Sequence, residues 1–216
     1  MKKLVLILLL PVSVWGADAI DFAPDTPGTV PKGWSVFMTD KGGAPKWQVV
    51  ADPTAPSKTG KVVGQTSTDP TNGRFPLLIY NNSNLKNGEV SVAFKTISGR
   101  VDQGAGLVWR YTDANNYYVT RANALEDNVV VYKVEKGVRI PLAPVGQPSN
   151  TYGLPHYVPN GVWNTLRVRI SGSLFSVYIN GRKILDVDDK TFPDAGKVGL
   201  WTKADSVIYF DNFEFE

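Results

Sequence analysis

The sequence predicts an all-β protein, a sandwich of two antiparallel sheets. Short segments rich in β-branched and aromatic residues recur along the chain, and glycine, proline, asparagine or aspartate separates them. No segment shows a sustained helical period with capping residues at its ends. The strongest local feature is Asn180-Gly181 between two alternating apolar runs, which is typical of a tight β-hairpin. A chain of 216 residues is long enough to bury a sizeable core as one such domain.

The expected strands follow one another with turn residues between them. Each has apolar residues at alternate positions or a short continuous apolar run, which indicates burial on one face or on both. In chain order they are Trp47–Val50, Lys61–Gln65, Phe75–Tyr80, Gly88–Ile97, Gly104–Tyr111, Asn116–Asn123, Asn128–Val134, Val138–Ala143, Trp163–Ile170, Leu174–Ile179, Arg182–Val187, Gly196–Lys203 and Val207–Phe215. The irregular stretch Val145–Asn160 is long for a connection, and such loops tend to be functional or mobile.

Residues 1–19 have the pattern of a secretory signal peptide. Lys2 and Lys3 precede the apolar run Leu4–Leu10, which Pro11 ends, and small residues follow. The run is too short to cross a bilayer as a helix. We therefore expect residues 20–216 to form a single domain that is periplasmic or secreted and has no membrane span after the signal peptide is removed.

This interpretation predicts the N-terminus of the exported protein. After expression in a bacterial host, mass spectrometry is expected to show a mature chain that starts near Ala17 or Ile20, because small residues suited to signal-peptide cleavage lie there. Retention of Met1 on the exported protein would contradict the prediction.

Two features of the composition exclude classes of function. The absence of cysteine rules out disulfides, thiolate metal sites, a cysteine nucleophile and a lipoprotein-type lipid anchor. The formal net charge is +3, but Lys2 and Lys3 are part of the signal peptide and no basic stripe appears elsewhere. Nucleic acid is therefore not expected as a partner.

Polar and aromatic side chains within the expected strands are the best candidates for a binding site. Arg110 and Arg121 occupy positions at which central strands normally carry aliphatic residues. If they form a sugar-facing platform, their guanidinium groups are expected to point into one concavity. Aromatic, guanidinium and amide groups suit the stacking and hydrogen bonding of sugars. The alternative is that the arginines only cover a sheet face with their apolar stems. The candidate ligand-binding residues are Arg110, Tyr118, Arg121, Asn123, His156, Trp201 and Lys203.

His156 is the only histidine and lies in the loop Val145–Asn160. One interpretation makes it a general acid or base at the rim of a cleft. No G-x-S-x-G elbow or other activated nucleophile accompanies it, and a single loop histidine is more often a surface or packing residue.

Several motifs carry a resemblance to known families. The pattern W-x-x-L-x-V from Trp163, followed by G-x-x-F-x-V-Y-I-N-G from Gly172, resembles the laminin-G and concanavalin A-like jelly-roll sandwiches. The segments GLVWRY (106–111), NYYVTRAN (116–123), AGKVGLW (195–201) and FDNF (210–213) are similar to the concanavalin A-like domains grouped with the 3-keto-disaccharide hydrolases. The resemblance covers roughly residues 21–216 and implies a jelly-roll sandwich of two antiparallel sheets.

The resemblance implies three alternatives for function. The first is an exported domain that binds a saccharide or glycoconjugate on its concave sheet face. The second is a glycoside-cleaving enzyme of the 3-keto-disaccharide hydrolase type, with catalytic residues unassigned. The third is a protein-interaction module like laminin-G domains. The E-x-D-x-x-E motif of family-16 glucanases is absent, so retaining β-glucanase chemistry is disfavoured.

The resemblance also implies a structural Ca²⁺. Asp21, near the expected mature N-terminus, and Asp211, in the last expected strand, meet if the terminal strands pair. Carboxylate and carbonyl oxygens are hard ligands that suit this ion. The alternative is that Asp211 only accepts local hydrogen bonds.

Overall fold

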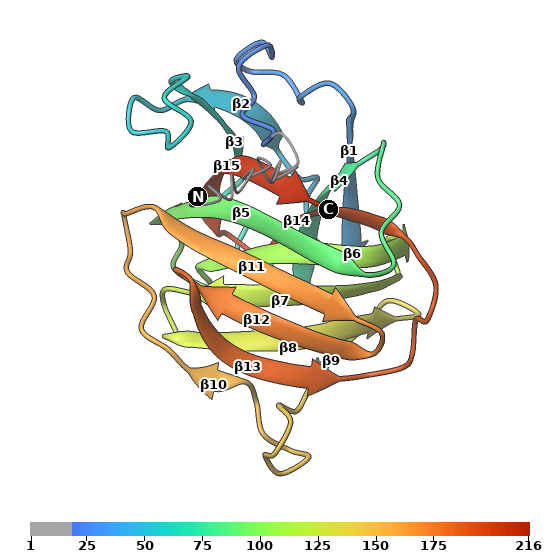
Figure 1. Ribbon diagram of the computed structural model, residues 1–216. Coiled ribbons are helices and arrows are strands. Elements are labelled where there is room, and N and C mark those ends of the chain that lie inside the picture. The colour runs from blue at the N-terminus through green and yellow to red at the C-terminus, as the bar shows by residue number, and fades with distance from the viewer. Residues whose placement is uncertain (1–18) are drawn as a thin grey trace, which may run out of the picture.

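The computed structural model describes residues 19–216, in which all regular elements are strands of two antiparallel sheets that pack face to face (Figure 1). The predicted sandwich is confirmed. Apart from Ala19, the expected signal peptide lies outside the described residues. In the part that is described, no helix is long and apolar enough to span a membrane.

The first sheet has eight strands. Seven of them are hydrogen-bonded in the order β1 (Trp34–Asp40), β4 (Arg74–Tyr80), β14 (Lys197–Thr202), β6 (Gly104–Asp113), β7 (Asn116–Asn123), β8 (Asn128–Glu135) and β10 (Leu154–Pro155). The eighth strand, β9 (Val138–Leu142), pairs with the other part of the same edge of β8. Strand β1 was not among the expected strands, and β10 lies within the predicted loop.

The second sheet has seven strands. Their order is β13 (Arg182–Asp188), β12 (Leu174–Ile179), β11 (Asn164–Ser171), β5 (Gly88–Ser98), β15 (Val207–Phe215), β3 (Lys61–Gln65) and β2 (Trp47–Ala51). In β11 the alternation of the sequence matches the burial directly. Leu166, Val168 and Ile170 are buried, whereas Arg167 and Arg169 lie on the outer face.

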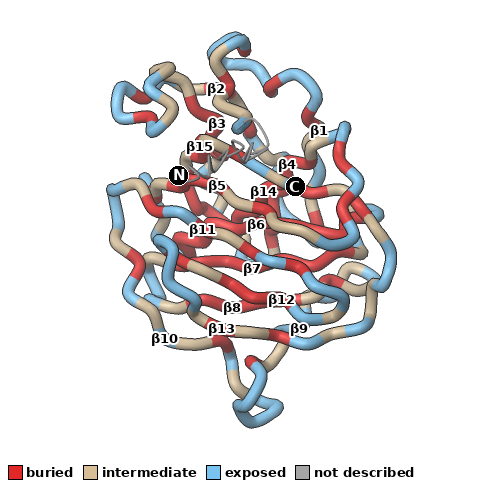
Figure 2. Tube along the Cα trace, in the orientation of Figure 1, coloured by how far each residue is buried: buried red, intermediate tan, exposed pale blue. Residues whose placement is uncertain are grey.

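The main core fills the space between the sheets. Trp109 on β6 packs edge-on against Phe175 on β12 at 5.1 Å and stacks on Tyr118 of β7 at 5.6 Å between ring centroids. All three rings are fully buried, and each contributes roughly 1.5–3 kcal/mol through loss of apolar surface. Figure 2 shows buried residues concentrated in the strands of both sheets and exposed residues in the loops.

The first sheet is strongly curled. Neighbouring strands lie about 4.8 Å apart, so β4 and β8, four steps apart in the order, would be roughly 19 Å apart in a flat sheet. The guanidinium of Arg139 on β9 nevertheless lies 4.6 Å from the ring of Phe75 on β4 and 4.4 Å from the ring of Tyr132 on β8. The side of the sheet that carries these residues faces away from the core and is concave, and we call it the curled face. A second apolar cluster covers it: Phe75, Leu77, Ile79, Val108, Tyr111, Tyr117, Val119, Val130, Tyr132, Val134 and Trp201.

The hairpin between β12 and β13 has the predicted turn. Asn180 has φ = 49° and Gly181 has φ = 79°, as a type I′ turn requires. The Asn180 side chain accepts a hydrogen bond from the Thr165 backbone amide at 2.8 Å, which ties the turn to β11.

Replacement of Gly181 by valine is expected to lower the free energy of unfolding by roughly 1 kcal/mol or more, because a β-branched residue tolerates positive φ poorly. A Cβ atom at this position would meet nothing within 4 Å, so the cost arises from the backbone alone. Urea denaturation measures the effect, and Gly181→Asn is the control that should cost less. An equal midpoint for the valine variant and the wild type would contradict this explanation.

Candidate functional site

Polar side chains gather where β7 turns into β8 at one end of the curled face. We call them the Arg121 cluster: Asp102, Arg121, Asn123, Glu126, Asn128, Tyr152 and Lys203. The Arg121 side chain is fully buried; its Nη1 donates to Asn128 Oδ1 at 2.7 Å, and its Nη2 donates to Glu126 Oε2 at 2.7 Å and to the Tyr152 hydroxyl at 3.2 Å. The cluster opens to solvent through Tyr152, which is 47% exposed.

A second set of contacts joins Asp102 to the cluster. The Asp102 carboxylate accepts from Lys203 Nζ at 2.7 Å and from Asn123 Nδ2 at 3.1 Å, and it is fully buried. Its loop is held in place by Asp205, whose carboxylate accepts from the backbone amides of residues 100, 101 and 102. The same loop borders a hollow of about 590 Å³.

Two glycines in β6 make room for the large side chains of the cluster. Gly106 lies opposite Arg121, and a Cβ atom there would sit 3.0 Å from the ring of Trp201. Gly104 lies opposite Asn123, and its Cβ atom would sit 2.9 Å from Asp102 and 3.3 Å from the Arg121 side chain. A larger residue at either position would push these side chains out of place.

The electrostatics favour the charged forms of Arg121 and Glu126. Burial by itself lowers the pKa of the Arg121 guanidinium, but Tyr132, Asp102 and Glu126 raise it by more, so the net pKa is above its usual value. Burial raises the pKa of the Glu126 carboxyl, but Arg121, Asn128 and Lys203 together lower it by more, so that the net pKa is below its usual value. An arginine and a carboxylate therefore face the open end of the curled face in their charged forms.

Aromatic rings continue the site along the curled face. Phe75 and Trp201 stack at 5.6 Å between centroids with an angle of 15° between their planes. The guanidinium carbon of Arg121 lies 5.9 Å from the centre of the Tyr132 ring, whose hydroxyl is hydrogen-bonded to that of Tyr152. Polar groups and flat rings thus adjoin in one place.

Of the predicted residues, Arg121, Asn123 and Lys203 come together in the cluster and Trp201 lies beside it. Arg110 does not join them, and the expectation that the two arginines share one concavity is wrong. A positive φ of 48° at Arg110 interrupts the regular register of β6, so the side chain turns toward Phe175 in the core. There it donates to the carbonyls of Lys86, Phe192 and Gly172.

Tyr118 and His156 also lie away from the Arg121 cluster. The Tyr118 hydroxyl donates to Asp189 at 2.6 Å and accepts from the Phe192 backbone amide at 3.0 Å, on the core side of the sheet. His156 follows β10 and is half-buried. Burial lowers its pKa, and so does Arg182.

Sequence reasoning missed several residues of this region, among them Asp102, Glu126 and Arg139. Two local signals could have pointed to this region. One is the pair Asn123 and Asn128, which bracket the β7–β8 turn, and the other is the alternation Gly104-Ala-Gly106 in the strand beside β7. They indicate a tight turn close to a bulky neighbour. Arg139 carries no such local signal, because its partners are distant in the sequence.

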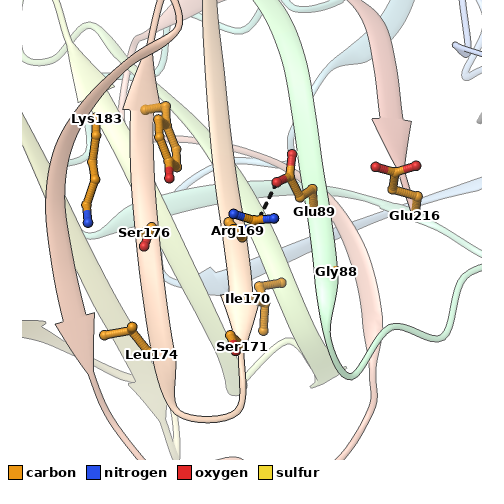
Figure 3. Close-up of a pocket in the computed structure, with 10 residues that line it drawn as sticks. Gly88, Glu89, Arg169, Ile170, Ser171, Leu174, Ser176, Lys183 and Glu216 are labelled. Atoms are coloured by element: carbon orange, nitrogen blue, oxygen red, sulfur yellow. Dashed lines mark ion pairs between the residues drawn. The ribbon is translucent and has the colours of Figure 1, made fainter. Parts of the chain in front are cut away.

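The outer face of the second sheet offers a different surface. A groove of about 750 Å³ runs over β5, β11, β12 and β13, and Glu89 and Arg169 form an ion pair in it (Figure 3). Glu89 accepts from Arg167 at 2.9 Å and from Arg169 at 3.1 Å. Arg167 also covers the ring of Tyr178 at 4.3 Å. Because Arg167 already covers the Tyr178 ring, this face is a weaker candidate for ligand binding than the Arg121 cluster.

The N-terminal segment meets the last strand, β15, through an isolated bridge and not through the pairing of two terminal strands on which the metal hypothesis was based. Ile20 and Phe213 exchange backbone hydrogen bonds of 2.8 and 3.1 Å, which brings Asp21 toward Asp211. Asp211 is fully buried; its Oδ2 accepts from the Ser57 amide at 2.9 Å, and its Oδ1 has no hydrogen-bond partner within residues 19–216. Burial raises the pKa of the Asp211 carboxyl, and the nearby Asp21 adds to the shift. An orphaned carboxylate oxygen beside a second carboxylate fits a bound cation.

Many solved structures are similar to this chain, and three of them illustrate the shared fold. The carbohydrate-binding module CBM66 from Bacillus subtilis has 21% identity and a TM-score of 0.62, over 85% of this chain and 95% of that one. A protein of unknown function with a galectin-like fold from Bacillus subtilis has 12% identity and a TM-score of 0.53, over 86% and 89% of the two chains. The GH43 protein BlXynB from Bacillus licheniformis, a mutant, has 14% identity and a TM-score of 0.55, over 97% of this chain and 40% of that one.

These likenesses concern the fold. No curated protein sequence matches the chain. The family model described as a 3-keto-alpha-glucoside-1,2-lyase-like domain, in contrast, matches residues 25–216. Because this match extends over nearly all of the described residues, the chain belongs to the family of 3-keto-alpha-glucoside-1,2-lyase-like domains.

Proposed function

We propose that the Arg121 cluster binds a saccharide at the open end of the curled face. The observation that carries the proposal is the convergence of a guanidinium, two carboxylates, an ammonium, two amides and a phenol beside stacked aromatic rings. Sugar hydroxyls both donate and accept hydrogen bonds, so they match a site that offers both donors and acceptors. The buried contacts of Arg121 fix the geometry before a ligand arrives.

The comparisons support this proposal. One of the similar structures is a carbohydrate-binding module, and the family model is described by a glucoside-cleaving activity. The signal-peptide pattern of residues 1–19 supports a periplasmic or secreted location, where polysaccharides and glycoconjugates are accessible.

A glycan array probed with the full chain tests the proposal, followed by calorimetric titration of the sugars that bind. Tyr152→Phe removes the hydroxyl that Arg121 and Tyr132 contact and is expected to weaken binding about tenfold. Tyr157→Phe is the matched control, since Tyr157 lies in the same loop with 71% of its surface exposed. Absence of binding to every glycan, or equal affinities for both variants and the wild type, would count against the site.

An enzyme that cleaves 3-keto-glucosides is the second candidate. The family match and the presence of two carboxylates, Asp102 and Glu126, near one guanidinium favour it. Incubation with a 3-keto-disaccharide, followed by NMR of the products, distinguishes an enzyme from a binding domain. Cleavage by the wild type but not by Glu126→Gln would establish the enzyme, and an unchanged substrate would leave binding as the function.

The proposal includes a structural Ca²⁺ held by Asp21 and Asp211. Calcium is expected to raise the melting temperature relative to protein treated with EDTA, because an ion that binds only the folded state stabilises it. Asp211→Asn should abolish the increase, and Mg²⁺ should give a smaller one because it prefers a tighter octahedral shell. A wild-type melting temperature that does not respond to Ca²⁺ would contradict the site.

A further inference from the structure

Arg139 occupies the middle of the curled face and is held there by rings alone. Its guanidinium carbon lies 4.6 Å from the ring of Phe75, 4.4 Å from that of Tyr132 and 5.8 Å from that of Trp201. Phe75 and Trp201 lie on the neighbouring strands β4 and β14, whereas Tyr132 lies on β8, three strands further along the sheet. Contacts from two separate parts of the curled sheet therefore fix the position of the guanidinium. The Arg139 side chain therefore loses its conformational entropy when the protein folds, before any ligand binds.

The donors of Arg139 have no partner among the described residues. Its side chain forms no hydrogen bond or ion pair within residues 19–216, and its Nη1 is buried without an acceptor. The three fully buried arginines, in contrast to Arg139, all donate hydrogen bonds to acceptors within the protein. Arg74 and Arg110 each donate to three backbone carbonyls, and Arg121 donates to a carboxylate, an amide and a phenol. An arginine fork held in place without an acceptor is prepared for an acceptor from outside.

The charges near Arg139 point to the sign of that acceptor. Tyr132 contacts both Arg139 and Arg121, so the two guanidinium groups lie against one ring. Arg121 pairs with Glu126, and Lys203 pairs with Asp102. Arg139 therefore adds one positive charge that no carboxylate of the described residues balances within 4.0 Å. A ligand with a carboxylate would neutralise this charge and accept two parallel hydrogen bonds from the fork.

We propose that the saccharide bound by this protein carries a carboxylate, as in a uronic acid residue, and that Arg139 binds this carboxylate. The inference rests on the proposed function and adds the chemical class of its ligand. Arg121 and its cluster then bind the sugar hydroxyls, and Arg139 selects acidic over neutral sugars.

The test uses a matched pair of ligands with the full chain. Trigalacturonate and its methyl ester present the same sugar with and without the negative charges, and calorimetric titration measures both affinities at low and high salt. We expect the acid to bind at least about tenfold more tightly than the ester, with the difference shrinking as salt increases. Sodium acetate should bind far more weakly than trigalacturonate, which shows that the sugar is needed as well as the charge.

Two substitutions of Arg139 test whether this residue causes the preference for the acid over the ester. Arg139→Met keeps an unbranched stem on the rings and is expected to bind acid and ester equally, whereas Arg139→Lys keeps the charge without the fork and should retain part of the preference. Arg167→Met is the matched control, because Arg167 also covers a tyrosine ring but is paired with Glu89 on the other sheet. It should leave the preference unchanged.

The outcomes separate this inference from the proposed function. Equal wild-type affinities for acid and ester, or a preference that survives in folded Arg139→Met, would overturn the role of Arg139 and leave saccharide binding intact. Binding of neutral glycans only would do the same. Failure to bind any saccharide, acidic or neutral, would overturn both.

Discussion

Replacement of Arg110 by methionine is expected to lower the free energy of unfolding by about 3–5 kcal/mol, because it removes a buried cation that binds backbone carbonyls. Arg110 is 2% exposed and donates to Phe192 at 2.7 Å, to Lys86 at 2.9 Å and to Gly172. These carbonyls belong to three separate loops, so the substitution removes the side chain that links these loops at one end of the sandwich. Urea denaturation measures the loss.

Arg169→Met is the control for this experiment. The Arg169 side chain is 64% exposed and pairs with Glu89 on the outer face, so its loss should cost no more than about 0.5 kcal/mol. A small effect of Arg110→Met, similar to that of the control, would show that the three loops hold their positions without Arg110. The binding of saccharide by the folded fraction of Arg110→Met should be unchanged.

Replacement of Arg121 by methionine is expected to reduce saccharide affinity more than any other substitution in the cluster, by at least about a hundredfold. Arg121 holds Glu126, Asn128 and Tyr152 in place, so its loss changes several sugar contacts together. The variant should also lose about 1–3 kcal/mol of stability, because these partners lose charge-assisted hydrogen bonds. Titration with the glycans that bind the wild type measures the affinity.

Arg121→Lys separates the two effects, since it keeps the charge beside Glu126 but cannot reach all three partners at once. Circular dichroism must show that each variant is folded at the temperature of the titration. Undiminished affinity in a folded Arg121→Met would make this arginine structural. It would also move the binding site toward the loop Val145–Asn160 and His156.

Much of the fold follows from local pattern. The alternation in β11, the Asn180-Gly181 turn and the regular spacing of strands each depend on residues that are close in the sequence. Strand β1 was missed because it mixes apolar residues on both of its faces, as in Trp34, Val36 and Phe37. It is a strand because it pairs over its whole length with β4, which is far along the chain.

The residues of the candidate site also divide into those that local pattern places and those that tertiary packing places. A strand period of two places Arg121 and Asn123 on one face, and the structure has them so. The same rule fails at Arg110, because one residue with positive φ in β6 redirects its side chain into the core. A local irregularity of this kind is decided by the packing around it and leaves little trace in the composition of the strand.

The sequence by itself determined the class of fold, the turn at Asn180-Gly181 and the types of side chain that are available for a ligand. Only the tertiary structure decided which of these side chains meet. The curl of the first sheet places Phe75, Tyr132 and Trp201 around Arg139. The physical reason is that curvature brings together strands far apart in the chain, whereas sequence periodicity reports only which face of its own strand a residue occupies.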